Sequence, residues 1–197
     1  SGGSSPERYE WMQTFPRNWD AVIDDMFGPL ITRSAGTEGA GSAGKIELHT
    51  RVNFEFRKEK YLQRPRPGLS EKDNIAETGR DYFDKMTGSV IPGRFWDNAE
   101  DFEARGRGLT LLHAGEIAST AYSAFVIDNM LEIGIETVEK FRGRGYAEIT
   151  CSWLIDYCLQ NNLIPVWACR RGNTASYSLA IKLGFEPVLE IPFTGWP

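Results

Sequence analysis

The feature that most constrains the fold is the stretch of residues 130–147, MLEIGIETVEKFRGRGYA. Its first half alternates apolar residues at 131, 133 and 135 with polar or small residues at 132, 134 and 136. That is the period of a strand with two distinct faces. The run RGRGYA follows, and an amphipathic pattern continues to residue 158. The stretch therefore predicts a strand, a tight turn and a helix over residues 146–160.

The glycine-rich turn suits an anion. Gly143, Gly145 and Ala147 keep bulk away from the turn, so backbone N–H groups can converge at the start of the helix. A helix N-terminus carries unpaired donors and a positive partial charge, which favours a phosphate. The alternative is an ordinary strand–helix turn with two arginines in solvent, because short motifs often arise by coincidence.

The order strand, Arg-x-x-Gly-x-Ala, helix resembles the acetyl-CoA pyrophosphate loop of the GNAT acyltransferases, whose pattern is Gln/Arg-x-x-Gly-x-Gly/Ala. A second block, NTASYSLAIKLGF over residues 173–185, lies at the spacing that the family shows. The resemblance covers residues 45–193. It implies an α/β (α+β) GNAT fold: a central mixed, mostly antiparallel sheet with a splayed strand pair and helices on both faces.

Bulk composition argues against several other classes of protein. With 41% hydrophobic and 25% charged residues, the 197-residue chain has the composition of an ordinary globular domain. A net charge of −5 argues against a general affinity for nucleic acid, and no apolar run reaches the ~18 residues of a membrane span. Cys151, Cys158 and Cys169 show neither a CxxC pair nor a zinc spacing. We expect a reduced, cytoplasmic protein with no metal.

The first 44 residues differ from the rest. The start, SGGSS, looks like a tag, and residues 34–44, SAGTEGAGSAG, contain nothing that could pack. Between them, Asn18 can cap a helix whose apolar residues recur at helical spacing from 19 to 27. We expect this helix to dock on the domain or on a partner chain, the second case giving a homodimer. The predicted organisation is an N-terminal region over residues 1–44 and an acetyltransferase domain over residues 45–197.

The remaining elements follow from periodicity and turn signals. Short connections predict three neighbouring antiparallel strands, and a right-handed crossover then places a further strand beside the third. Predicted strands cover residues 45–57, 109–113, 117–127, 130–138, 163–169 and 187–192. One predicted helix begins at Ser70, and two further predicted helices cover residues 98–104 and 173–183.

The resemblance assigns roles to particular residues. In a GNAT enzyme two strands part, and the pantetheine arm of acetyl-CoA bonds to backbone in the gap. Asn173 would bond the pantetheine amide, although a plain helix N-cap is an equally consistent role. The implied cofactor-binding residues are Ile135, Glu136, Thr137, Arg142, Gly143, Arg144, Gly145, Tyr146, Ala147, Asn173 and Ser176. Four aromatic residues would lie near the acceptor or else form core: Tyr82, Phe83, Phe95 and Trp96.

The implied reaction moves an acyl group from a thioester to an amine, so the acceptor ammonium must lose a proton. Glu132 is the preferred catalytic base, because it shares a strand face with Gly134 and Glu136; a solvated or ion-paired role is the alternative. At the position of Ala180, many GNAT members have a tyrosine that acts as the general acid for the leaving thiolate. The tyrosine of this helix, Tyr177, lies one turn earlier.

Three functions remain in competition. The leading hypothesis is an acetyl-CoA-dependent N-acetyltransferase acting on a primary amine of a small molecule, because the second block is similar to that of the zwittermicin-resistance type of GNAT. The alternative is a non-catalytic acyl-CoA-binding domain with a regulatory or scaffolding role, which the missing tyrosine favours. An RNA-binding role for the two arginines is poorly supported in an acidic chain.

Overall fold

Tight turns between alternating segments build the centre of the fold. The computed structural model describes residues 31–33 and 46–195. In it, β4 (Gly108–His113), β5 (Glu116–Ile127) and β6 (Met130–Thr137) follow one another and pair antiparallel. The two connecting turns use left-handed backbone at Ala114, Gly115 and Asp128. The prediction of three neighbouring antiparallel strands is therefore confirmed.

Further strands extend this sheet on both sides. β3 (Asp73–Glu77) pairs antiparallel with β4. On the other side β7 (Ile164–Arg170) pairs parallel with β6, and β2 (Ile46–Phe56) follows β7 in the strand order. β8 (Phe185–Gly195) pairs with β2, and the short β1 (Ile31–Arg33) pairs parallel with the first residues of β2. The sheet is mixed and mostly antiparallel, as predicted.

The described residues fall into two compact units. The smaller holds residues 31–33, 46–51, 170–172 and 190–195, and within it the Arg171 amide donates to the Thr50 carbonyl at 2.8 Å. The larger holds residues 52–169 and 173–189, and it contains every residue of the predicted site. The N-terminal helix and linker predicted before residue 45 lie outside the described residues, and the predicted boundary after residue 44 stays a prediction.

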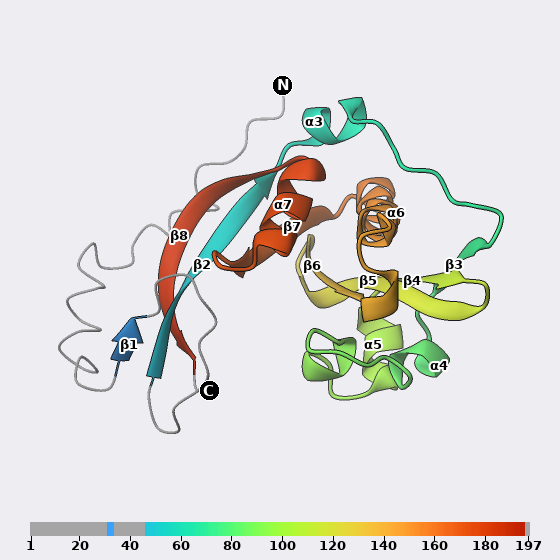
Figure 1. Ribbon diagram of the computed structural model, residues 1–197, viewed down its shortest axis with the longest axis horizontal. Coiled ribbons are helices and arrows are strands. Elements are labelled where there is room, and N and C mark those ends of the chain that lie inside the picture. Colours follow the sequence, from blue (N-terminus) through green and yellow to red (C-terminus); the bar gives the residue numbers. More distant parts are fainter. Residues whose placement is uncertain (1–30, 34–45, 196–197) are drawn as a thin grey trace. The chain divides into compact units, whose positions relative to one another are not determined.

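Helices cover both faces of the strands in the larger unit (Figure 1). α6 (Tyr146–Gln160) packs on one face of β4, β5 and β6. α4 (Arg80–Phe83) and α5 (Ala99–Arg105) lie on the other face. The neighbouring β5 residues Ala121 and Tyr122 accordingly belong to different hydrophobic clusters. Along the chain the remaining helical segments are α3 (Lys58–Gln63), the two 3-10 turns Pro92–Arg94 and Glu139–Phe141, and α7 (Thr174–Lys182).

Most predicted elements are confirmed to within a few residues. The helix predicted over residues 146–160 has those bounds, because Gly145 is its N-cap and most of its apolar residues face the core, Trp153 being an exposed exception. α5 begins one residue later than predicted, where the Asn98 side chain accepts a hydrogen bond from the Asp101 amide. β8 is longer than the predicted 187–192 and pairs with β2.

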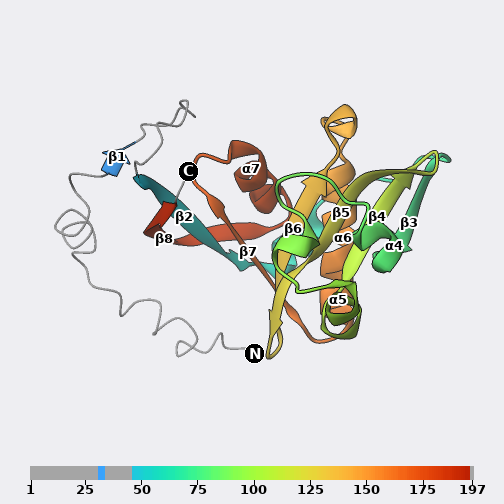
Figure 2. The same cartoon turned by 90° about the horizontal axis from the view of Figure 1, so that it is seen from below.

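The helix predicted to begin at Ser70 is wrong. The Asp73 carboxylate does accept hydrogen bonds from the Ser70 amide and hydroxyl, at 2.8 and 2.7 Å, but these bonds close a turn. Residues 73–77 then form β3, the strand next to β4 (Figure 2). Backbone pairing with β4 and burial of Ile75 against the core outweigh the local helix signal.

α3 was not predicted. It follows β2 directly and begins at Arg57, which offers no side-chain cap. Its Tyr61 is fully buried, and the Tyr61 hydroxyl donates to the Asp156 carboxylate on α6 at 2.7 Å. A six-residue helix of this kind is stabilised by such tertiary contacts rather than by its own sequence pattern.

The structure also bears on the state of the cysteines and on membrane-spanning segments. All three cysteines are buried, and burial raises the pKa of the Cys158 thiol to about 12. In the described part of the chain, no helix is long and apolar enough to span a membrane.

A buried ion pair anchors the first turn of α6. The Arg64 guanidinium lies 3.0 Å from the Glu148 carboxylate, and each side chain is only 8% exposed. Lys182 of α7 approaches the other carboxylate oxygen at 2.6 Å. Arg64 also stacks on the Tyr61 ring at 4.7 Å. These contacts join two separate segments of the larger unit, α3 with its C-cap Arg64 and the end of α7, to the helix whose first turn forms the predicted phosphate site.

Replacing Arg64 with methionine should lower the free energy of unfolding by about 3 kcal/mol, the low end of the range for breaking a buried pair, because Lys182 remains on Glu148. Arg105→Met is the matched control: Arg105 pairs with Asp101 but is 68% exposed, so its loss should cost at most about 0.5 kcal/mol. Urea unfolding of both variants measures the difference. Equal stability of the two variants would contradict this account of the anchor.

Candidate functional site

β6 and β7 part after a few residues. Their parallel pairing runs from Met130 and Ile164 to Glu132 and Val166, where the register recorded in the described chain ends. β6 nevertheless continues to Thr137 and β7 to Arg170. The predicted splayed pair is therefore present. On its other edge, β6 stays paired with β5 along its whole length, so the backbone of residues 133–137 faces the gap on one side only.

The turn that follows β6 leaves open space in front of the helix. Gly143 and Gly145 have φ of 75° and 81°, and a Cβ built on either would meet no atom within 4 Å. Gly145 is the N-cap of α6 and provides no side-chain hydrogen bond to its first amides. Those amides have no intrahelical acceptor, and the helix dipole adds positive potential. The turn can accept an anion such as a pyrophosphate.

Flanking side chains fix the turn and add charge. The Arg142 Nε donates to the Thr137 carbonyl at 3.2 Å, and its Nη2 lies 3.6 Å from the Glu136 carboxylate. The Arg144 guanidinium lies over the Phe141 ring at 5.3 Å. Both arginines are exposed. Two cations therefore stand at the rim of the turn without filling it.

Tyr146 is buried and anchors the turn from below. Its hydroxyl lies 2.8 Å from the His113 Nδ1, which also lies 2.7 Å from the Asp73 carboxylate. Burial alone would raise the pKa of Asp73, but hydrogen bonds from His113, Ser70 and Tyr146 lower it to about 2. This small network ties the beginning of β3 to the first residue of α6. The Tyr146 side chain is thus structural, and the predicted role of Tyr146 in cofactor binding, through its backbone, stays a prediction.

The predicted polar pair on α7 is already engaged. The side-chain Oδ1 of Asn173 accepts a hydrogen bond from the Ser176 amide at 3.1 Å, which makes Asn173 the N-cap of α7. The Ser176 hydroxyl accepts from the Trp167 indole at 3.2 Å, across to β7. Both residues therefore lie at the N-terminal end of α7, which follows β7 along the chain. Asn173 is exposed, and its amide NH₂ points to no recorded acceptor within the described residues.

The two glutamates of β6 have different surroundings. Glu132 is half-buried and sits opposite Val166 at the point where β6 and β7 part. The Glu136 carboxylate accepts from the amides of Ser89 and Val90 at 3.1 and 3.0 Å. Glu136 therefore holds the segment before the 3-10 turn Pro92–Arg94 against β6.

The four aromatic residues expected near the acceptor divide into two groups. Phe83 and Trp96 are core: both pack on Phe102, and the Trp96 indole donates to the Ser123 carbonyl at 2.7 Å. Phe95 is 50% exposed, and its ring lies 6.0 Å from that of Tyr122. Tyr82 is half-buried on α4. Of these four residues, only Phe95 is an exposed ring, and it lies beside Tyr122.

Tyr122 was not among the predicted site residues. It lies directly opposite Gly134 in the β5–β6 register and is fully buried. The sequence did contain a signal: a glycine in the middle of an alternating strand often marks the close approach of another group. Here that group is the Tyr122 ring, whose Cζ would lie 2.5 Å from a Cβ at residue 134.

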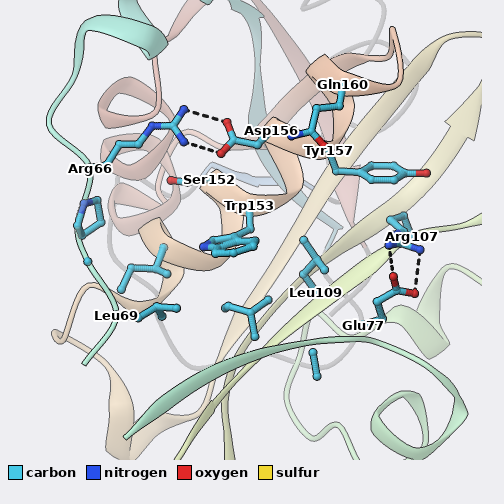
Figure 3. A pocket seen from close by; sticks show the side chains of 15 residues that line it. Arg66, Leu69, Glu77, Arg107, Leu109, Ser152, Trp153, Asp156, Tyr157 and Gln160 are labelled. Carbon is cyan, nitrogen blue, oxygen red and sulfur yellow. Dashed lines mark hydrogen bonds and ion pairs between the residues drawn. The ribbon is translucent and has the colours of Figure 1, made fainter. Parts of the chain in front are cut away.

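A separate hollow of about 630 Å³ lies beside α6 (Figure 3). Trp153 and Leu109 line its centre, with the ion pairs Arg66–Asp156 and Arg107–Glu77 on opposite sides. None of the predicted cofactor or catalytic residues lines it. This hollow is therefore separate from the predicted site at the gap between β6 and β7.

The chain matches a known protein family over a region that contains both the sheet of the larger unit and the glycine turn. A family model described as GNAT acetyltransferase matches residues 40–192. The chain belongs to the GNAT acetyltransferase family. The matched region contains β6, the glycine turn, α6 and α7, so the predicted resemblance is confirmed at the level of the family.

Individual relatives agree with this assignment. An uncharacterized N-acetyltransferase, YdfB of Bacillus subtilis, is 35% identical over 96 residues, which are 49% of this chain and 37% of that protein. The chain thus matches little more than a third of the curated relative. A GCN5-related N-acetyltransferase-like protein from Streptococcus suis has a similar structure, with a TM-score of 0.68 at 22% identity, covering 92% of this chain and 69% of the other.

A third relative is a tandem GNAT protein from the clavulanic acid biosynthesis pathway, with a TM-score of 0.59 at 14% identity. The matched region covers 99% of this chain and 61% of the tandem GNAT protein. At such identities the two solved structures show a shared fold. They support the α/β GNAT fold that the sequence predicted.

The glycine turn can be tested by charge. Gly145→Glu should abolish measurable coenzyme A binding, because a carboxylate would stand where the phosphates are expected and repel them. Gly145→Gln carries the same backbone strain at positive φ and nearly the same bulk, so it is the matched control and should retain more affinity. Titration calorimetry compares the two variants. Equal affinities would show that this turn is not the anion site.

The Asp73 network predicts an acid-sensitive contribution to stability. Because the folded-state pKa is lowered from 3.8 to about 2, the ionised Asp73 stabilises the fold above about pH 4, and this contribution is lost as the pH falls toward 2. Asp73→Asn should therefore be less stable than the wild type at pH 7, with a difference that narrows below pH 4. Urea unfolding across this range measures it. A difference that stays constant down to pH 2 would contradict the assignment.

Proposed function

We propose that this protein is an acetyl-CoA-dependent N-acetyltransferase that acetylates a primary amine of a small molecule. The observation that supports this most directly is the coincidence of two features at one place. β6 separates from β7, and the same strand runs into an open glycine turn at the start of α6. A ligand with an extended amide-bearing arm and a pyrophosphate matches both features.

The described residues fit such a ligand. The backbone of Ile135, Glu136 and Thr137 faces the gap on the side away from β5 and can bond an extended arm. The amides of residues 143–147 can hold the pyrophosphate, with Arg142 and Arg144 at the rim. Bound acetyl-CoA would supply the activated acyl group as a thioester. No group of three or more candidate metal ligands occurs in the part of the chain that the structure describes.

The protein's own chemical contribution is proton handling at the acceptor. An alkyl ammonium has a pKa near ~10.4 by analogy with lysine, so at neutral pH it must be deprotonated before it can attack. Glu132 is our candidate for the base, because it lies on the β6 face away from α6, at the point where β6 and β7 part. The leaving thiol needs less help, since its pKa is near ~8.5 by analogy with cysteine.

α7 supplies no acid in the usual place. Ala180 is fully buried in the main hydrophobic core, so the position has no access to a reacting group. Tyr177 packs its ring edge against Phe54 at 5.2 Å. This arrangement also gives the alternative its support, namely a domain that binds acyl-CoA without turning it over. A small-molecule acceptor, as in the zwittermicin-resistance type of GNAT, rests on the sequence resemblance.

The proposed function and its alternative can be separated directly. The protein is mixed with acetyl-CoA and a panel of small amines and aminoglycosides, and thiol release is followed with a thiol reagent. Amine-dependent release supports the enzyme. Coenzyme A binding by calorimetry without release on any amine supports the silent domain, whereas no binding at all overturns both.

Glu132→Gln should depress turnover by about 10²–10⁴, the typical contribution of a general base. The loss should ease as the pH rises, because free amine then forms without help. Acetyl-CoA affinity should change little, since β6 offers backbone to the cofactor. Tyr177→Phe is the control and should retain nearly full turnover, because its ring contacts Phe54 and the phenol lies off the usual acid position. Near-normal turnover of Glu132→Gln at pH 7 would make Glu132 structural.

A further inference from the structure

The Tyr122 hydroxyl is buried and has no hydrogen-bond partner among the described residues. Tyr122 as a whole has no exposed surface. Buried polar groups are nearly always satisfied, because a group removed from water without a new hydrogen bond destabilises the fold. An orphaned hydroxyl that persists in a packed structure therefore calls for an explanation, and a ligand that completes its hydrogen bond is one.

The position of this hydroxyl is set by a glycine. Tyr122 on β5 faces Gly134 on β6, and a Cβ at residue 134 would lie 2.5 Å from the Tyr122 Cζ and 2.9 Å from its hydroxyl oxygen. The phenol end thus lies directly over the β6 backbone, where any side chain would exclude it. Gly134 is two residues past Glu132, the last β6 residue recorded as paired with β7. The ring therefore carries its hydroxyl over β6, at the part of the strand where the pairing with β7 has ended.

The surroundings keep this hydroxyl a donor. Burial first, and the nearby Glu136 carboxylate second, raise the pKa of Tyr122 far above its ordinary value, while Arg94 opposes them. The phenol therefore keeps its proton at neutral and mildly alkaline pH. A buried carboxylate or amine in this place would have to change its charge on desolvation, whereas a phenol stays neutral and still donates.

Away from the sheet, Tyr122 belongs to a buried cluster with Phe83, Trp96 and Phe102, and one further ring beside it reaches solvent. The Phe95 ring, 6.0 Å from that of Tyr122, is half exposed. It follows the segment that Glu136 holds through the amides of Ser89 and Val90. Movement of one exposed ring is therefore a small change compared with opening the sheet itself.

On the basis of the proposed function, we propose that the Tyr122 hydroxyl donates a hydrogen bond to the acyl carbonyl oxygen of the bound thioester. No bond is made or broken by Tyr122 itself. The interaction holds the acyl group at the start of the gap between β6 and β7 and stabilises the negative charge that grows on the carbonyl oxygen during attack. It supplies from β5 a hydroxyl donor that α7, with the buried Ala180, does not provide.

Calorimetry with acetyl-CoA and with coenzyme A, which lacks the acyl carbonyl, tests this without an acceptor. The wild type should bind acetyl-CoA about 3–10-fold more tightly than coenzyme A, the range expected of one neutral hydrogen bond. Tyr122→Phe keeps the ring over Gly134 and removes only the hydroxyl. It should bind coenzyme A like the wild type and lose most of its preference for acetyl-CoA. Its melting temperature should not fall, because the hydroxyl has no partner to lose.

Tyr177→Phe is the matched control, another tyrosine of the larger unit, and should keep the wild-type preference. An unchanged preference in Tyr122→Phe, or a wild type without any preference, would overturn the role of Tyr122 while leaving the proposed function in place. A clear fall in melting temperature for Tyr122→Phe would show that the hydroxyl serves the fold. A wild type that binds neither ligand would instead overturn the proposed function, and with it the role of Tyr122.

Discussion

The unequal pairing of β6 is the constraint on which the rest of the site depends. Along one edge β6 bonds to β5 over its whole length, but along the other it bonds to β7 only up to Glu132. A strand that is held on one side and released on the other keeps its place while exposing backbone donors and acceptors. Exposed strand edges can pair with extended chains. Here the exposed edge is short, lies inside the sheet and leads into the glycine turn. The two halves of one ligand site are thus positioned by a single strand.

The glycine turn works because its surroundings are rigid. Gly143 and Gly145 supply left-handed backbone and empty space, but such residues do not hold a turn in place by themselves. Rigidity comes from Tyr146, whose hydroxyl is fixed below the turn by His113, and from the buried pair of Arg64 and Glu148 two residues further into α6. An anion site of this kind gains affinity because its amides need not be ordered when the ligand arrives.

Sequence reasoning predicted most of the fold and placed the glycine turn of the candidate site. Strong periodicity placed β4, β5, β6 and α6, and the turn motif placed the open glycine turn at the start of α6, whose role as an anion site stays a prediction. It failed where long-range pairing decides: residues 73–77 carry a local helix signal, yet the free edge of β4 makes them a strand. It also missed Tyr122, because what gives that residue its place is Gly134, twelve positions away, and alternation alone does not show which ring covers which glycine.

The two glutamates on the outer face of β6 show how position divides roles within one strand. The Glu136 oxygens already receive the amides of Ser89 and Val90, and Arg142 stands 3.6 Å away, so a substrate proton would have to displace donors that hold a whole segment. Glu136 therefore connects the segment before the 3-10 turn Pro92–Arg94 to β6 and is a poor candidate for a base. Glu132 lies four residues earlier, where the strands part and where the proposed function has the reacting groups meet. In that proposal one strand serves both the proton transfer and the cofactor, because a period of two keeps these residues on one face while their spacing keeps them apart.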